Sequence, residues 1–322
     1  MFRAIAAAAA AMLLSTAVPA QDYPSRTITI TVPFAAGGPT DTVARLIGQS
    51  MGKTLGQTII IENVAGAGGT IGVEKVAKAK PDGYTLLLMH IGISTSPSLY
   101  RNLRYDPIKE LDPIGLITDV PMTVIANKDF PPKDMKELIA YVRANKDKVT
   151  YANAGVGAAS HLCGMLLMTA IQADVTTVPY KGTGPAMTDL IGGQVNFMCD
   201  QTTNTTPQIK GGKVKAYAVT TRTRVKSLPD VPTAEEAGLK GFEVAVWHGL
   251  WAPHGTPKPA MDKLVSALQA ALKDPNVVAK FAELGTEPVS QDRATPEALR
   301  TQLKSEIDKW GPIIKKAGVY AD

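Results

Sequence analysis

The chain has 322 residues, of which 45% are hydrophobic and 6% aromatic, and its formal net charge is +5. This length and composition are enough for two domains of ordinary size, each with its own hydrophobic core. The 34 basic residues are scattered and aromatic residues are few, which argues against the basic stripe of a nucleic-acid-binding protein. The mild basic excess is instead suited to a small anionic ligand.

The first 20 residues predict a secretory signal peptide. Residues 1–3 give a positively charged start, residues 4–14 are apolar, and residues 18–20 form a small-residue cleavage site. The apolar run is too short to span a bilayer permanently. No cysteine follows the cleavage site, so we expect no lipid anchor there. The mature chain should begin near Gln21 and be exported.

Strands and helices alternate after the signal peptide, which predicts mostly parallel α/β sheets with helices on both faces. Strands are expected at 27–32, 58–61 and 84–89, and helices at 41–51 and 70–79. The third strand is apolar without alternation, as is typical of a strand covered on both faces.

A change of organisation is expected near Pro121. The sequence predicts a strand that leaves the first unit, then an inserted unit, then a returning strand at 242–247. Further strands are expected at 122–126, 149–152, 176–180, 195–199 and 214–220, and further helices at 131–145, 160–172, 183–191, 259–273, 276–284 and 295–317.

We therefore predict a two-lobe α/β protein with a ligand cleft between its lobes. Residues 21–123 and 244–322 would form the first lobe, and residues 124–243 the inserted second lobe. Because the chain crosses between the lobes twice, a hinge is expected at the crossings.

Two glycine-rich loops, each between a strand and a helix, are the most informative feature of the sequence. The first lies in residues 27–41 and the second in residues 149–161. A helix start offers unpaired N–H groups and partial positive charge, and small residues let a ligand come close to them. Two such loops predict that two lobes grip one negatively charged small molecule.

Neither nucleotide-binding motif is complete. Residues 48–54 resemble a phosphate-binding loop but are one residue short and lie at the end of a helix. Residues 66–72 resemble a dinucleotide loop, but Ile71 stands where the third glycine is required. We therefore expect no cofactor.

No metal site or catalytic residue is expected either. The four histidines, at positions 90, 161, 248 and 254, lack paired ligand spacing, and no nucleophile elbow is present. His161 is expected to be structural or to touch the ligand. Asp41 is expected to shape the first loop. Asp200 ends a predicted strand, where it could either bind the ligand or cap a turn.

Cys163 and Cys199 are the only cysteines in the sequence. In an exported protein a disulfide is an alternative to two small buried hydrophobic side chains. Each cysteine adjoins a predicted ligand-facing loop, and both alternatives remain open at this point.

Taken together, several segments resemble the substrate-binding proteins of tripartite tricarboxylate transporters, often called Bug receptors. The resemblance is collinear over essentially the whole mature chain, and the order and spacing of its motifs make it specific. The motifs are VPFAAGGPTD at 32–41, GAGGTIG at 66–72, PDGY at 81–84, VPYKG at 178–182, GGQV at 192–195, LPDVPT at 228–233 with EAG at 236–238, and WHG at 247–249 with AP at 252–253.

The resemblance implies a monomeric periplasmic receptor that closes over a carboxylate and needs no cofactor or metal. Such a receptor delivers its ligand to integral-membrane transporter subunits. In such receptors one carboxylate meets the first-lobe loop and the other ligand end meets the second-lobe helix start. The corresponding ligand-binding residues here are Phe34, Ala35, Gly37 and Gly38, then Gly157, Ala158, Ala159 and Ser160, with Asp200 near the strand end.

This chain departs from many relatives at two places. Ala36 replaces a common proline, and Ala158 and Ala159 replace hydroxyl residues found in some relatives. These changes bear on side-chain contacts but leave a backbone cradle intact. Two alternative functions remain. The same binding domain could serve a membrane sensor, or the protein could be a hydrolytic enzyme.

Overall fold

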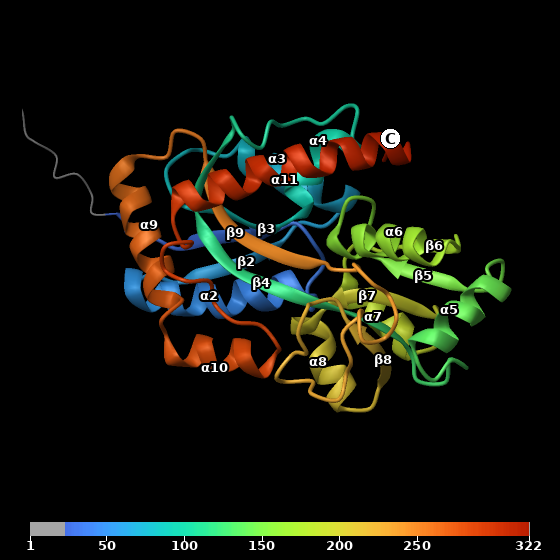
Figure 1. Cartoon of the computed structure of the whole chain (residues 1–322). Helices are drawn as coiled ribbons and strands as arrows, with labels where there is room; N and C mark the ends of the chain where they lie inside the picture. Colours follow the sequence, from blue (N-terminus) through green and yellow to red (C-terminus); the bar gives the residue numbers. More distant parts are fainter. Residues whose placement is uncertain (1–22, 322) are drawn as a thin grey trace, which may run out of the picture.

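A computed structural model describes residues 23–321, so the predicted signal peptide at 1–20 lies outside the described residues. The described strands form one curled sheet in the order β2-β1-β3-β9-β4-β7-β5-β6, with β8 paired to β4. Helices flank this sheet along its length (Figure 1). The predicted α/β architecture is confirmed. Below, residues 23–123 and 244–321 are called the first lobe and residues 124–243 the second lobe, following the predicted boundaries.

The first lobe is built around β1 (Ile28–Val32). This strand lies between β2 (Ile59–Asn63) and β3 (Thr85–His90) and runs parallel to both. Three of its alternating side chains, Ile28, Ile30 and Val32, are fully buried. The alternation of the sequence thus places one face of the strand in the core, as period-two patterning requires.

Two groups of helices cover the first-lobe strands. In Figure 1, α3, α4 and α11 lie above these strands, while α2 and α10 lie below them. Helix α4 packs against α11, and α2 packs against α9. The bounds are α2 (Pro39–Leu55), α3 (Thr70–Ala77), α4 (Gly92–Leu99), α9 (Lys258–Ala271), α10 (Pro275–Glu283) and α11 (Pro296–Ala317), with a short 3₁₀ turn η2 (Ala67–Gly69) before α3.

Helix α4 was not predicted from the sequence. Its serine-rich segment resembles a loop, because such residues compete with helical hydrogen bonding. Here the Ser94 and Ser96 hydroxyls donate to the carbonyls of Ile91 and Ile93 at 2.6 and 3.0 Å. Both hydroxyls are thereby satisfied inside the protein, and packing against α11 stabilises the helix.

The lobes are joined by two long strands, β4 (Leu111–Asn127) and β9 (Ala245–Pro253). Strand β4 pairs with β9 along residues 111–121 and with β7 and β8 along residues 122–127. All of these pairings are antiparallel, so antiparallel strands occupy the middle of the sheet and parallel strands its two outer parts. One strand therefore belongs to both lobes, and the predicted strand at 122–126 is only its last third.

The second lobe repeats the strand-helix alternation. Strand β5 runs parallel to both β6 and β7. Its elements are α5 (Met135–Ala144), β5 (Thr150–Asn153), α6 (Ala159–Ile171), β6 (Thr176–Pro179), α7 (Thr183–Ile191), β7 (Phe197–Gln201), α8 (Thr202–Lys210) and β8 (Val214–Val219).

Helix α8 was also missed by the sequence analysis. Four threonines and a proline in nine residues give it a poor intrinsic helix propensity. Its hydroxyls find partners elsewhere: Thr202 donates to the carbonyl of Gly285 at 3.0 Å, and Thr206 donates to that of Leu284 at 3.1 Å. Contacts with the first lobe therefore stabilise a helix that local sequence disfavours.

The structure joins Cys163 and Cys199 in a disulfide with a Cα–Cα distance of 6.1 Å. Of the two alternatives left open for these cysteines, a disulfide or two separate buried side chains, the structure has the disulfide. The bond ties the first half of α6 to β7, one residue before Asp200. Both side chains are completely buried.

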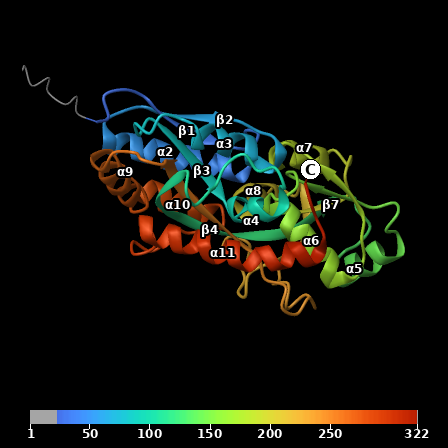
Figure 2. The same cartoon turned by 90° about the horizontal axis from the view of Figure 1, so that it is seen from above.

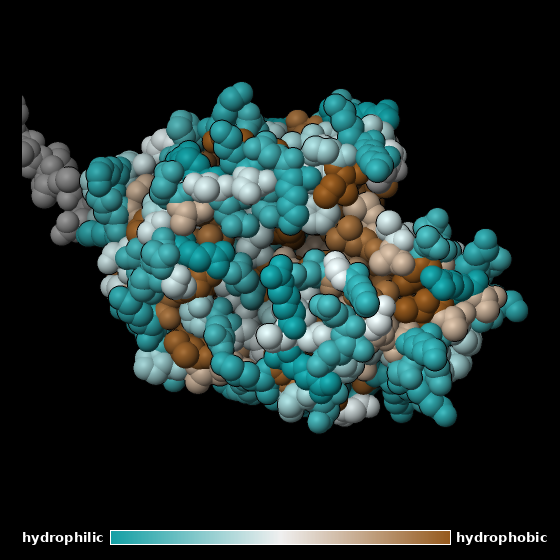
Figure 3. All heavy atoms as spheres, in the orientation of Figure 1, coloured by the Kyte–Doolittle hydropathy of each residue, from teal (hydrophilic) through white to brown (hydrophobic). Residues whose placement is uncertain are grey.

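Figure 2 shows α11 running along the whole first lobe and ending beside the second lobe. Its downstream residue Ala321 donates its N–H to the carbonyl of Leu99 at 3.0 Å. The face shown in Figure 3 is mainly hydrophilic, with small hydrophobic groups scattered over it. None of the helices in residues 23–321 is both long and apolar enough to cross a membrane.

Candidate functional site

A small, partly open cavity lies where the two lobes meet. Its volume is about 20 Å³, which is room for about one water molecule. Both lobes contribute to its wall. The lining residues are Phe34, Ala35, Gly38, Pro39, Thr40, Asp41 and His90 from the first lobe, and Ala154, Ala159, Ser160, Thr183, Asp200 and Gln201 from the second.

Four helices begin at this cavity. Gly38 precedes α2, Ala159 opens α6, Thr183 opens α7, and Gln201 precedes α8, and all four line the wall. The first turn of each helix has N–H groups without intrahelical partners and carries partial positive charge. Helix starts of this kind suit an anionic ligand.

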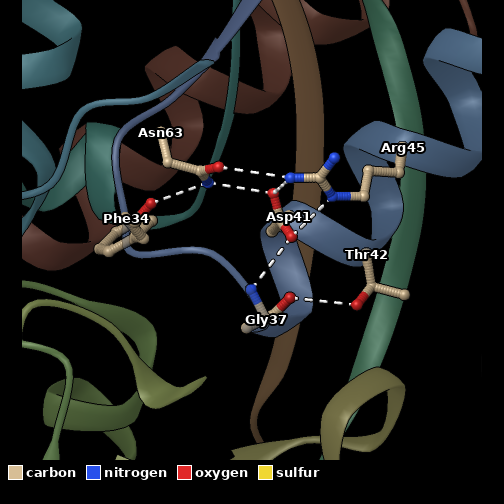
Figure 4. Close-up of polar contacts among 7 residues, drawn as sticks. Phe34, Gly37, Asp41, Thr42, Arg45 and Asn63 are labelled. Carbon is tan, nitrogen blue, oxygen red and sulfur yellow. Dashed lines mark hydrogen bonds and ion pairs between the residues drawn. The ribbon is translucent and has the colours of Figure 1, made fainter. Parts of the chain in front are cut away.

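Asp41 fixes the conformation of the first-lobe loop through hydrogen bonds (Figure 4). The N–H of Gly37 and the guanidinium Nε of Arg45 donate to Asp41 Oδ2 at 3.0 and 2.9 Å. Asn63 donates from Nδ2 to Asp41 Oδ1 and to the carbonyl of Phe34, both at 3.0 Å. Burial opposes ionisation of Asp41, but these hydrogen bonds outweigh it and lower its pKa. The prediction that Asp41 shapes the loop is confirmed.

The second-lobe loop is closed by Ser160. Its hydroxyl accepts the N–H of Ala154 at 2.9 Å, while its carbonyl accepts the hydroxyl of Tyr151 at 2.6 Å. Tyr151 in turn accepts the N–H of Cys199 at 3.1 Å. The Ser160 hydroxyl is thus hydrogen-bonded inside the protein.

Asp200 is buried in the cavity wall without a basic partner. Asn204 Nδ2 donates to Asp200 Oδ2 at 2.6 Å, and Thr183 and the N–H of Gln201 are its other described partners. None of these groups is charged. Burial outweighs the hydrogen bonds and raises the pKa of Asp200 to about 6. The second-lobe part of the wall therefore has a hydrogen-bond acceptor.

The lobes touch each other directly around the cavity. Ala35 donates its N–H to the carbonyl of Lys181 at 2.9 Å, across the lobe boundary. The hydroxyl of Tyr100 donates to the carbonyl of Val156 at 3.0 Å. A Cβ placed on Gly184 would lie 2.7 Å from the carbonyl oxygen of Ala36. Glycine at this position thus allows two backbones to approach closely, which explains the small cavity volume.

Six of the nine residues named from the sequence line the cavity, namely Phe34, Ala35, Gly38, Ala159, Ser160 and Asp200. The other three, Gly37, Gly157 and Ala158, lie outside its lining. Their N–H groups donate instead to Asp41 Oδ2 at 3.0 Å, to His161 Nδ1 at 3.4 Å and to the carbonyl of Gly155 at 3.1 Å.

Sequence reasoning did not predict Thr40, His90, Thr183 or Gln201 as ligand-binding residues, although all four line the cavity. A signal was present for three of them. Thr40 and Thr183 stand at helix starts, and His90 ends a strand at the sheet edge where ligands bind in α/β proteins. Gln201 was hidden, because the predicted strand stopped two residues early and α8 was not predicted.

Two buried histidines form the floor beneath the first-lobe loop. His90 stacks on Phe34 with ring centroids 4.8 Å apart, and His248 lies edge-on to His90 at 5.8 Å. Strands β3 and β9 bring them together, since His90 and His248 are paired across the ladder. Thr40 Oγ1 lies 3.4 Å from His248 Nε2. Within residues 23–321 no group of three or more histidine, cysteine, aspartate or glutamate residues could hold a metal ion.

Comparison with known proteins agrees with this architecture. A family model described as the tripartite tricarboxylate transporter family receptor matches residues 43–319. The structure of periplasmic binding protein BugD is 58% identical with a TM-score of 0.90, and the match covers 92% of this chain and 99% of that one.

Two further solved structures contain organic acids. MatC from Rhodopseudomonas palustris with bound malate is 45% identical, with a TM-score of 0.87 over 91% of this chain and 100% of its own. A second R. palustris protein, with adipate, is 34% identical, with a TM-score of 0.87 over 93% of this chain and 99% of its own. The chain belongs to the receptor family of tripartite tricarboxylate transporters, a family of periplasmic binding proteins.

Proposed function

We propose that this protein captures a small organic carboxylate between its lobes, closes over it, and delivers it to the membrane subunits of a tripartite tricarboxylate transporter. The observation that carries the proposal is the convergence of four helix starts, those of α2, α6, α7 and α8, on one cavity. Helix starts bind carboxylates through backbone N–H groups and the helix dipole.

Both lobes are needed to bind a ligand of useful affinity. A charge-assisted hydrogen bond contributes about 1.5–3 kcal/mol. Association costs on the order of 4–15 kcal/mol, and a micromolar ligand must retain about −8 kcal/mol after that cost. About five or six such bonds are therefore required. The first turn of one helix cannot supply them all, whereas helix starts from both lobes can.

The ligand is a dicarboxylate or an acid with a second polar end. MatC binds malate and the other R. palustris relative binds adipate, so acids with two polar ends fit this family. The first-lobe side of the cavity offers the helix start of α2, while the second-lobe side also contains the acceptor Asp200. A ligand group that donates a hydrogen bond would satisfy this buried carboxylate.

Ligand entry requires the lobes to separate. A cavity of about 20 Å³ is far below the roughly 300 Å³ of an ordinary small-molecule site. The described conformation is therefore too closed to hold a dicarboxylate. We infer that the lobes open about the two crossing strands, β4 and β9, to admit the ligand, and that they close over it with the contact between Gly184 and Ala36 kept. The lobe boundaries at 123/124 and 243/244 form part of this proposal.

We further propose that the mature protein acts in the periplasm as a monomer and catalyses no reaction. Bound acid should be recovered unchanged after prolonged incubation. Conversion of any acid would instead favour the hydrolytic alternative and direct attention to His161 and Asp200. A membrane sensor would use the same ligand site, so reconstitution with the transporter subunits is the measurement that separates the two outputs.

The direct test is isothermal titration calorimetry of the mature chain after unfolding and refolding to remove copurified ligand. Malate, adipate, succinate, citrate and acetate form the panel. Micromolar binding of a dicarboxylate, with weaker binding of acetate, is the expected result. Absence of binding by every member would overturn the proposed ligand class.

A further inference from the structure

We propose that His90 is a ligand-binding residue, and that its Nε2–H group donates a hydrogen bond to the carboxylate held at the start of α2. This inference rests on the proposed function, because it assigns an additional donor to the same site. It also goes beyond a cradle made only of backbone, since it assigns recognition to a side chain from the centre of the sheet.

The position of His90 supports a direct contact with the ligand. The residue ends β3, and it lines the cavity although only 3% of its surface is exposed. Stacking on Phe34 fixes the plane of its ring. A nearly buried polar side chain at a cavity wall is held in one orientation, and a ligand gains from such preorganisation because no rotamer has to be ordered on binding.

The hydrogen bonding of His90 assigns its tautomer. The N–H of Gly92 donates to His90 Nδ1 at 3.0 Å, so this nitrogen is an acceptor. In a neutral imidazole the proton must then lie on Nε2. Burial lowers the pKa of His90 to about 4, which keeps the ring neutral at ordinary pH. Nε2–H is thus the ring donor left for a ligand.

A second histidine positions a neighbouring hydroxyl group. His248 is completely buried. Its Nε2 lies 3.4 Å from Thr40 Oγ1. A backbone hydrogen bond with Val246 also holds the ring. The contact with His248 therefore fixes the position of the Thr40 side chain, which lines the cavity.

His90, Thr40 and the start of α2 all line the cavity from the first lobe. His90 and Thr40 come from different elements but are brought together by the cross-strand pair of His90 and His248. Neutral donors suit a site of this kind, because a carboxylate gains hydrogen bonds without a second buried charge in the wall. His248 itself is a positioning residue, since it acts on the ligand only through Thr40.

Two substitutions separate the role of His90 in binding from its role in folding. His90→Asn can keep an acceptor near Nδ1 for Gly92 but has no atom at the position of Nε2. His90→Gln can place an amide N–H near Nε2. With malate as the probe, or adipate if malate does not bind, His90→Asn should weaken affinity about 10- to 100-fold, and His90→Gln should recover part of the loss.

Matched control substitutions are available in the same chain. Thr40→Val removes a hydroxyl that faces the cavity and should weaken affinity. Thr31→Val removes a buried hydroxyl on β1 that has no partner among the described residues and does not line the cavity. Thr31→Val should therefore leave affinity unchanged.

Nitrogen NMR of the wild-type imidazoles gives a readout that does not depend on any variant. The Nε2–H tautomer of His90 is expected in the free protein, and its Nε2 resonance should shift when malate or adipate is added. An Nδ1–H tautomer, an unshifted Nε2 resonance in the complex, or unchanged affinity of a folded His90→Asn variant would overturn the inference alone. Failure of the wild type to bind any acid of the panel would overturn the proposed function and this assignment with it.

Discussion

Close backbone contact at Gly184 makes lobe closure testable with one methyl group. Gly184 lies in the first turn of α7, and a Cβ there would meet the Ala36 carbonyl oxygen at 2.7 Å and the Gly38 nitrogen at 3.2 Å. Ordinary van der Waals contact begins at 3.4 Å. Gly184→Ala should therefore prevent the lobes from reaching the described closed conformation.

The magnitude follows from two opposing effects. Forcing a methyl group into a well-packed contact costs about 1–3 kcal/mol, and here this cost falls only on the closed state. Ligand affinity should fall by roughly 5- to 150-fold. The same substitution replaces glycine inside a helix, which stabilises the fold by roughly 0.5–1 kcal/mol. Weaker binding is thus expected together with unchanged or higher thermal stability.

The assay combines calorimetry with small-angle scattering of the ligand-free and ligand-bound protein. Gly192→Ala is the matched control, because Gly192 caps the other end of α7 with φ of −75°, and a Cβ there would meet its nearest neighbour at an ordinary 3.4 Å. Wild type and control should become more compact with ligand, whereas Gly184→Ala should do so less. Equal affinity and equal compaction in all three proteins would refute the closure argument.

Three other perturbations test the site and the fold. Gly38→Val should abolish binding without lowering the melting temperature. The new Cβ has room, at 3.5 Å from the Gly184 nitrogen, while the two methyl groups would enter the cavity that Gly38 lines. Normal affinity in calorimetry would contradict the first-lobe assignment. Replacing Cys163 and Cys199 by alanine removes a cross-link between residues 36 apart and should cost about 4 kcal/mol in urea unfolding, as should reduction of the wild type; equal stability would contradict a disulfide. Because burial lowers the pKa of His90 to about 4, the free energy of unfolding should fall by about 3 kcal/mol as the pH drops from 6.5 to 4. The pKa of Asp200 is raised to about 6, so this group favours folding at low pH and opposes the trend. Between pH 4 and 6 the stability of Asp200→Asn should consequently rise more steeply with pH than that of wild type, and parallel urea-derived curves would contradict a buried, titrating Asp200.

Local patterns were sufficient for most of the architecture. Period-two alternation in β1 and the glycine-rich loops before α2 and α6 are patterns of neighbouring residues. The sequence therefore shows them without knowledge of any distant contact. The helices α4 and α8 could not be predicted in this way. Helix α4 is stabilised by packing against the distant α11, and the threonine hydroxyls of α8 donate to carbonyls of residues 284 and 285, which only folding brings near. Long-range packing overrides local propensity in both segments.

The candidate site shows the same division. The sequence alone located the two glycine-rich loops, the family, and Asp41 as the residue that shapes the first loop. The tertiary structure brought two further helix starts, those of α7 and α8, to the same cavity, and it paired His90 with His248. Residues 158 positions apart in the chain carry no mutual signal in one sequence, since their contact depends on the register of β3 against β9. The sequence by itself determined where helix starts with small residues lie, because that property is local. Only the fold decided which of them line one cavity, because that depends on contacts between distant segments.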